Sequence, residues 1–181
     1  DKAVIYIYGR TKKGEKICIK DKNFRPYFKV TCKEESLEQI KKTEEEKDGQ
    51  ILKVTEIKEI ETNILEKKTK TYKIFTNLPK AIPTLKKIIR NIEGVEGTYE
   101  TDILFVRRYL LDKSLTPINL LICEAEPDNE KSKIPIFEAK SIKQNDELPN
   151  PKILAIDIEV YNPLGKHIDM ERFPIIMIAL Y

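Results

Sequence analysis

Residues 81–94 read Ala-Ile-Pro-Thr-Leu-Lys-Lys-Ile-Ile-Arg-Asn-Ile-Glu-Gly and form the clearest pattern in the chain. Apolar side chains recur at helical spacing, and basic side chains occupy another face of the same helix. Pro83 suits the first turn of a helix, and Gly94 suits its end. The stretch therefore predicts an amphipathic helix. Its apolar positions are Ile82, Leu85, Ile88, Ile89 and Ile92, and its basic positions are Lys86, Lys87 and Arg90.

The segments around this helix predict a sheet. Strands are expected at residues 24–30, 51–60, 69–76 and 95–101. An earlier helix is expected to begin at Ser36, as its N-cap, and to run to about Lys47, where Asp48 and Gly49 end it. The resulting order, strand-helix-strand-strand-helix-strand, is typical of an α+β fold of the ferredoxin-like class, in which two helices cover one face of a sheet.

RNA-recognition modules share this βαββαβ order and are an alternative interpretation. Their central strand carries a basic residue followed by Gly-aromatic-Gly/Ala-Phe-Val-x-aromatic. The sequence contains no such run, which disfavours a true RNA-recognition module. The aromatic residues of 24–30 are then expected to be core residues, although a platform for bases is the other interpretation.

Two further regions flank this core. Residues 3–8 and 15–20 alternate as strands around a turn rich in glycine and lysine, which predicts a β-hairpin. Strands are also expected at 118–124 and 134–142. Residues 144–151 are polar, contain two prolines and suit a linker. We therefore expect two domains, 1–148 and 149–181, with the second beginning just before an acidic strand.

The acidic strand, residues 152–161, places Asp157 and Glu159 two positions apart, so both side chains point to one face. Neighbouring carboxylates repel each other, and a divalent cation relieves this repulsion. Mg²⁺ or Mn²⁺ prefers such oxygen ligands and supports phosphodiester cleavage. Alternation by itself favours a simpler interpretation, in which Ile156 and Ile158 face a core and the carboxylates face water.

Composition sets wider limits. The chain has 181 residues, and its 33 lysines and arginines against 30 acidic residues leave a net charge of +3, so any nucleic-acid contact must come from local patches. Three widely spaced cysteines and the single His167 form no zinc pattern and suggest a reducing, cytoplasmic setting. The longest apolar run, residues 175–181, is far shorter than the roughly 20 residues of a membrane span. No membrane association is expected.

One local patch joins positive charge to aromatic rings. Arg107 and Arg108 lie between Phe105 and Tyr109, a mixture that contacts phosphates and stacks bases. An equally ordinary interpretation is that the two adjacent arginines lie on a solvated helix face. The chain also begins on Asp1 and stops at Tyr181 within a strand-like run, so we expect it to be a piece of a longer protein.

Several separated motifs together resemble one family. They are Tyr-Gly at 8–9, Phe-Arg-Pro-Tyr-Phe at 24–28, Tyr-Glu-Thr-Asp-Ile at 99–103, Arg-Arg-Tyr-Leu-Leu-Asp at 107–112 and Ile-Leu-Ala-Ile-Asp-Ile-Glu at 153–159. In this order they resemble the amino-terminal region of family B DNA polymerases, most closely the archaeal replicative enzymes. The resemblance covers nearly the whole chain.

The resemblance implies two functions. The Asp-x-Glu pair opens the family's 3′-to-5′ proofreading exonuclease, an RNase H-like domain, so Asp157 and Glu159 are implied ligands of Mg²⁺ or Mn²⁺. Residues 173–178 resemble the second exonuclease strand. The family's remaining carboxylate motifs would lie beyond residue 181, so this chain alone is expected to be inactive both as a nuclease and as a polymerase.

The second implied function is sensing of uracil in the template ahead of synthesis. The resemblance places ten residues at or beside the base pocket, and Arg107 and Arg108 beside the template. The pocket residues are Tyr8, Pro26, Tyr27, Pro79, Ile82, Pro83, Glu100, Asp102, Ile103 and Phe105. The sequence departs from the family's usual pattern at Ala81, Thr101 and Leu104.

The implied parent is a DNA-directed DNA polymerase, a nucleotidyltransferase of DNA replication. Its implied partners are single-stranded and primer-template DNA, the remainder of the polymerase chain and a sliding clamp. Two other hypotheses stay open from the sequence. One is a stand-alone, metal-dependent nuclease of the RNase H-like class, and the other is a non-catalytic module that binds nucleic acid or a protein partner.

Overall fold

The computed structural model describes residues 2–64, 66–147, 150, 152–162 and 171–181. The chain divides into two compact units, Asp1–Asp146 and Glu147–Tyr181. The described residues form a mixed α+β fold that consists mostly of strands, with three α-helices. Each unit is considered by itself.

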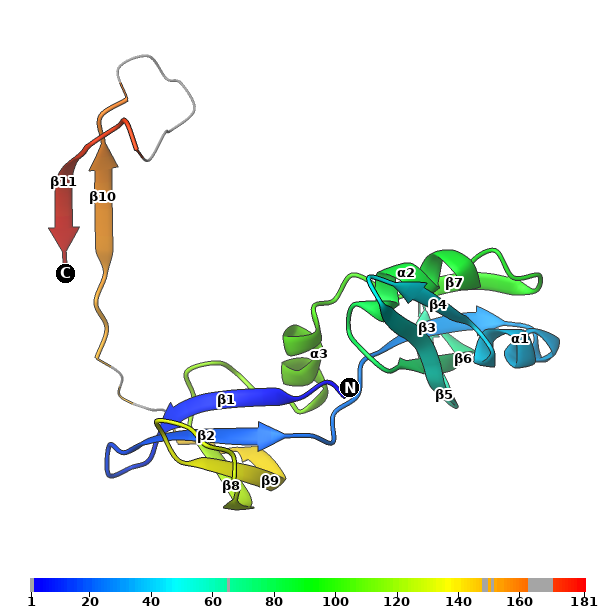
Figure 1. The fold of residues 1–181 in the computed structure, drawn as a ribbon, viewed down its shortest axis with the longest axis horizontal. Helices are drawn as coiled ribbons and strands as arrows, with labels where there is room; N and C mark the ends of the chain where they lie inside the picture. The colour runs from blue at the N-terminus through cyan, green and yellow to red at the C-terminus, as the bar shows by residue number, and fades with distance from the viewer. Residues whose placement is uncertain (1, 65, 148–149, 151, 163–170) are drawn as a thin grey trace. The chain divides into compact units, whose positions relative to one another are not determined.

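Unit 1 contains two sheets, and the larger has five strands (Figure 1). Its order is β4-β5-β6-β3-β7, and every neighbouring pair is antiparallel. The strands are β3 (Tyr27–Cys32), β4 (Glu44–Lys47), β5 (Gln50–Ile64), β6 (Lys67–Thr76) and β7 (Val95–Tyr99). The four expected strands are therefore present, with β4 added at one edge.

Two helices, α1 (Leu37–Lys41) and α2 (Ala81–Ile89), share one core with this sheet. Ile82, Leu85 and Ile89 of α2 are buried there, as the helical spacing predicts. Alternate residues of the strands meet them because side chains of a strand point to opposite faces in turn. These strand residues include Phe28, Val30, Tyr72 and Ile74, which are all 3% exposed or less.

The prediction of a first helix to Lys47 was wrong. A 3₁₀ turn (Glu34–Ser36) leads into α1, which ends at Lys41, and Glu44–Lys47 is strand β4, paired with β5. Asp48 and Gly49 have φ of 53° and 69°, and two consecutive positive φ angles suit a tight hairpin turn that joins β4 to β5. The Asp-Gly pair thus reverses a strand and does not stop a helix.

Ser36 does not act as the expected side-chain cap. Its hydroxyl donates to the carbonyl of Glu93 at 2.7 Å. Gly94 follows with φ of 81°, and a Cβ there would lie 2.5 Å from the Ser36 oxygen. Gly94 is required both by its backbone conformation and by this close approach. The contact joins the start of α1 to the segment after α2.

A second sheet in unit 1 has the order β1-β2-β9-β8. Its strands are β1 (Ile5–Arg10), β2 (Lys16–Asp21), β8 (Leu121–Pro127) and β9 (Ile136–Gln144). The predicted hairpin of β1 and β2 is confirmed, while β8 begins three residues later than expected, after Ile118 with φ of 58°. Helix α3 (Phe105–Asp112) packs on this sheet through Tyr109, which is 1% exposed.

Unit 2 contains an antiparallel pair, β10 (Ile156–Val160) and β11 (Ile175–Leu180). Asp157 lies opposite Ala179, and Glu159 lies opposite Met177. His167 falls outside the described residues. Within the described part of the chain, none of the helices has the length and apolarity that a membrane crossing requires.

Candidate nucleic-acid interface

Tyr27 is the centre of a polar cluster in unit 1. It is the first residue of β3 and is 4% exposed. Its hydroxyl donates to Asp112, with a shorter distance of 2.8 Å to Oδ2. The Arg108 guanidinium lies 4.8 Å from the centre of the Tyr27 ring, and the Lys73 ammonium lies 4.2 Å from it. Strands of the first sheet and helix α3 therefore meet at this tyrosine.

Glu100 holds two of the basic groups of this cluster. Its carboxylate lies 2.7 Å from Lys29 Nζ and 2.7 Å from Arg108 Nη1. Burial by itself raises the pKa of the Glu100 carboxyl, but the two cations outweigh burial and hold the pKa below its ordinary value. Glu100 has φ of 57°, so the chain turns sharply there as it leaves β7.

The beginning of α2 lies beside the beginning of β3. The Pro26 carbonyl accepts a hydrogen bond from the Thr76 amide at 2.9 Å, and the Thr76 hydroxyl donates to the Leu78 carbonyl at 3.0 Å. Pro79 follows, and its carbonyl accepts from the Ile82 amide at 3.2 Å. Pro26 and Ile82 are buried, whereas Pro83 is exposed. These short links bring four of the expected pocket residues to one end of the first sheet.

The segment from Glu100 to Phe105 connects β7 to α3. The Arg108 amide donates to the Leu104 carbonyl at 2.8 Å, so this segment leads directly into α3. Phe105 packs against Phe24, with ring centres 5.4 Å apart. Ile103 is half-buried and Asp102 is exposed.

Tyr8 and Arg107 lie differently from the other expected site residues. Tyr8 is 71% exposed on β1. Together with other residues of the β1–β2 hairpin, it lines a cavity of about 1250 Å³. The Cys18 side chain and burial raise its pKa. Arg107 is exposed, whereas its neighbour Arg108 is 6% exposed.

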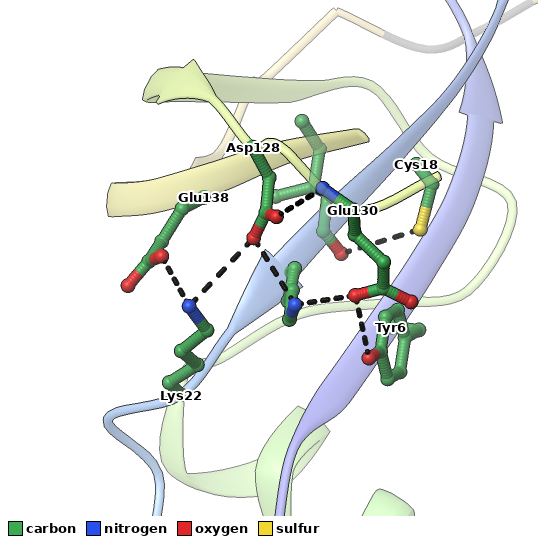
Figure 2. Close-up of polar contacts among 8 residues, drawn as sticks. Tyr6, Cys18, Lys22, Asp128, Glu130 and Glu138 are labelled. Carbon is green, nitrogen blue, oxygen red and sulfur yellow. Dashed lines mark hydrogen bonds and ion pairs between the residues drawn. The ribbon is translucent and has the colours of Figure 1, made fainter. Parts of the chain in front are cut away.

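A separate ion-pair cluster joins the β8–β9 loop to β2 (Figure 2). Lys20 Nζ lies 3.1 Å from Asp128 and 2.5 Å from Glu130, and Lys22 Nζ lies 2.5 Å from Glu138. The Glu130 amide and Lys20 hold the pKa of Asp128 below its ordinary value. Because these carboxylates are matched by lysines, the cluster holds the loop in place and offers little to an added cation.

Asp157 and Glu159 occupy one face of β10, as alternation predicts, and both are exposed. Ile156 and Ile158 are 61% and 50% exposed, so the expected core contact of these side chains is absent from the described residues. Two hard oxygen ligands on one face fit part of a Mg²⁺ or Mn²⁺ site. The described residues contain no group of three or more acidic, histidine or cysteine side chains that could hold a metal.

Comparison with known proteins identifies the family. Residues 96–181 match the family model of the family B DNA polymerase exonuclease domain. DNA polymerase 1 of Pyrococcus abyssi is 30% identical over 98% of this chain, and a DNA polymerase of Methanocaldococcus jannaschii is 34% identical over all of it. The chain corresponds to the amino-terminal region of archaeal family B DNA polymerases.

This polymerase region spans 19% of the Pyrococcus relative and 10% of the Methanocaldococcus relative. The family B polymerase structure from Pyrobaculum calidifontis shares its fold, with a TM-score of 0.70 and 24% identity. That likeness covers 99% of this chain and 24% of the Pyrobaculum chain. The exonuclease match begins in β7 and so includes the last part of unit 1.

Sequence reasoning named Arg108 but missed Lys29 and Lys73, the two lysines of the Tyr27 cluster in this polymerase region. Lys29 alternates with the buried Phe28 and Val30, so the period of two does place it on the opposite face of β3. Lys73 lies opposite Lys29 in β6. No local pattern indicated that Asp112 accepts from Tyr27, because 85 residues separate them.

Two buried tyrosines predict a loss of stability at alkaline pH. Burial raises the pKa of Tyr27 and of Tyr109, and the carboxylates of Asp112 and Asp21 raise them further. Unfolded tyrosines lose their protons near pH 10, while the folded ones keep theirs. The contribution of the two tyrosines to the free energy of unfolding is therefore complete below about pH 10. Above pH 10, each tyrosine lowers that free energy by about 1.4 kcal/mol per pH unit.

Denaturant titrations from pH 8 to pH 11.5 measure this effect. The variant with both Tyr27→Phe and Tyr109→Phe should lose stability less steeply above pH 10 than the unaltered chain. Tyr161→Phe, at an exposed position in unit 2, is the control. Equal slopes for the double variant and the unaltered chain would contradict the expectation, because lysines contribute equally to both.

Proposed function

We propose that unit 1 binds single-stranded template DNA and captures uracil. The observation that supports this function is the convergence on Tyr27 of segments that are distant in sequence. Lys73 of β6 and Arg108 and Asp112 of α3 contact Tyr27, and Glu100 pairs with Arg108. Small apolar walls beside backbone donors and acceptors suit a pyrimidine edge, and a close wall excludes the methyl group of thymine.

The positive groups of the Tyr27 cluster support contact with the DNA backbone. Lys73 and Arg108 lie over the Tyr27 ring, Lys29 pairs with Glu100 beside Arg108, and Arg25 lies 4.3 Å from the centre of the Phe75 ring. Cations near aromatic rings suit phosphate contact and base stacking together. Arg107, exposed on α3, is a further phosphate contact in this proposal.

The test is a titration of the 181-residue chain with two labelled oligonucleotides that differ by uracil or thymine at one position. We expect at least tenfold tighter binding of the uracil strand, measured by fluorescence anisotropy at fixed salt. Ile103→Ala, at a half-buried wall position, should reduce the ratio, whereas Ile118→Ala, at an 83% exposed position, should not. Equal affinity for both strands would remove the sensing proposal.

For unit 2, we propose the beginning of a 3′-to-5′ exonuclease domain of the RNase H-like class. The proposed domains are 1–148 for template binding and 149–181 for this beginning. Asp157 and Glu159 would hold Mg²⁺ or Mn²⁺ through carboxylate oxygens. When bound, such ions supply an activated water and stabilise the leaving oxygen. The chain's own contribution is to place both carboxylates on one face of β10.

The whole parent protein would synthesise DNA on primer-template substrates and associate with a sliding clamp. The chain itself should leave labelled single-stranded DNA intact in Mn²⁺, because two carboxylates are too few for a two-metal site. Degradation that Asp157→Asn abolishes would instead support a stand-alone nuclease.

A further inference from the structure

The face of the five-stranded sheet opposite α1 and α2 carries an unusual row of side chains. Strand register places Lys58 opposite Lys73, Lys73 opposite Lys29, and Lys29 opposite Tyr99. Residues that lie directly opposite share a face, so the row crosses β5, β6, β3 and β7 in turn. The neighbouring positions Phe28 and Ile74 point into the core on the other side.

Three lysines lie side by side on neighbouring strands of this row. Like charges directly opposite one another destabilise a sheet, so such a row has a cost that a function would explain. Glu100 matches Lys29 at 2.7 Å. Within the described part of the chain, neither Lys58 nor Lys73 forms an ion pair with a carboxylate. Burial holds the pKa of Lys73 below its ordinary value, and its ammonium lies over the Tyr27 ring. Asp112 and Glu100 act on Lys73, and Lys58 acts on Glu56, only at longer range, so both lysines lack a close carboxylate partner among the described residues.

A cavity of about 550 Å³ lies at the Tyr99 end of the row, and its volume suits a nucleobase with its sugar. Of the expected pocket residues, only Glu100 and Asp102 line it. The lining residues are Lys29, residues 62–64, Lys86, Thr98, Tyr99, Glu100, Thr101 and Asp102.

Tyr99 lies against Gly97 at this cavity. Gly97 lies two residues earlier on the same strand, and a Cβ there would lie 2.5 Å from the Tyr99 hydroxyl oxygen and 2.9 Å from Cε2. The ring therefore lies over the bare backbone of Gly97. An aromatic ring beside a row of lysines has the composition of a stacking platform for single strands.

We propose that this face is a second contact for single-stranded DNA, which shares Lys29 and Lys73 with the Tyr27 cluster and does not require uracil. The lysine row contacts phosphates, and Tyr99 stacks one base at the cavity, independently of base identity. Neighbouring strands lie about 4.8 Å apart, so the three lysines span about 10 Å, enough for adjacent phosphates. The proposal rests on template binding by unit 1 but not on recognition of uracil.

The test uses an oligothymidylate without uracil, so a failure of uracil capture does not affect it. Lys58→Gln should reduce the slope of log affinity against log salt by about 0.7, the value for one lost single-strand phosphate contact. Tyr99→Leu should weaken binding about tenfold or more and leave that slope unchanged, because stacking carries no charge.

Two matched variants control for net charge and for loss of an aromatic ring. Lys41→Gln removes one charge from α1, and Tyr161→Leu removes an exposed ring from unit 2. Neither should change binding, and thermal unfolding verifies that every variant is folded. The proposal is overturned if Lys58→Gln and Lys41→Gln have equal effects, if Tyr99→Leu binds like the unaltered chain, or if duplex DNA or oligocytidylate RNA binds more tightly than the oligothymidylate.

Discussion

Replacement of Arg108 by methionine should lower the free energy of unfolding by about 2 kcal/mol. Arg108 is 6% exposed and lies 2.7 Å from Glu100 and over the ring of Tyr27. Methionine preserves much of the packing but leaves the Glu100 carboxylate with Lys29 as its remaining partner. Urea denaturation followed by circular dichroism gives the difference.

Arg107→Met is the matched control, because it makes the same chemical change one residue earlier on the same helix. Arg107 is exposed, so its replacement should change the unfolding free energy by less than about 0.5 kcal/mol. For DNA binding the ranking should be reversed. Arg107→Met should reduce the salt dependence of binding more than Arg108→Met, because the exposed arginine is the better phosphate contact. Equal stability losses for the two variants would contradict the pairing of the buried Arg108 with the half-buried Glu100.

Leu85→Ala in α2 should lower the free energy of unfolding by about 3 kcal/mol. Leu85 is fully buried in the core that α2 shares with the five-stranded sheet. Alanine preserves helical propensity, so the loss comes from removed apolar contact and from the cavity that remains. Chemical denaturation measures the change.

Lys87→Ala, on the exposed face of the same helix, separates burial from helix propensity. It should stay within about 0.5 kcal/mol of the unaltered chain. A loss below 1 kcal/mol for Leu85→Ala would contradict the burial of this helix face.

Local patterns in the sequence predicted much of the secondary structure of unit 1. The spacing of Ile82, Leu85 and Ile89 predicted the buried side of α2, because helical geometry depends on neighbours within one or two turns. The β1–β2 hairpin followed from alternation around a turn for the same reason. Asp48 and Gly49 were ambiguous, since positive φ angles suit both the end of a helix and a tight hairpin.

The sequence predicted which residues belong to the candidate site better than it predicted where they lie. Tyr27, Glu100 and Arg108 were named from motifs, and the structure brings them together. Tyr8 was named in the same way but lies at a separate cavity on β1. The parallel pairing of β2 with β9, which brings residues 18–20 beside 136–138, has no local signal because more than 100 residues separate the strands.

By itself, the sequence determined the elements with a strong period and the paired carboxylates of β10, because each depends on residues close together in the chain. It also determined the family, because the order of separated motifs can be read without a tertiary structure. Only the tertiary structure decided that Arg108 is buried while Arg107 is exposed, and that Lys58, Lys73 and Lys29 stand in one row. The physical reason is that burial and strand register depend on which distant segments pack together, and a local period carries no information about the partner.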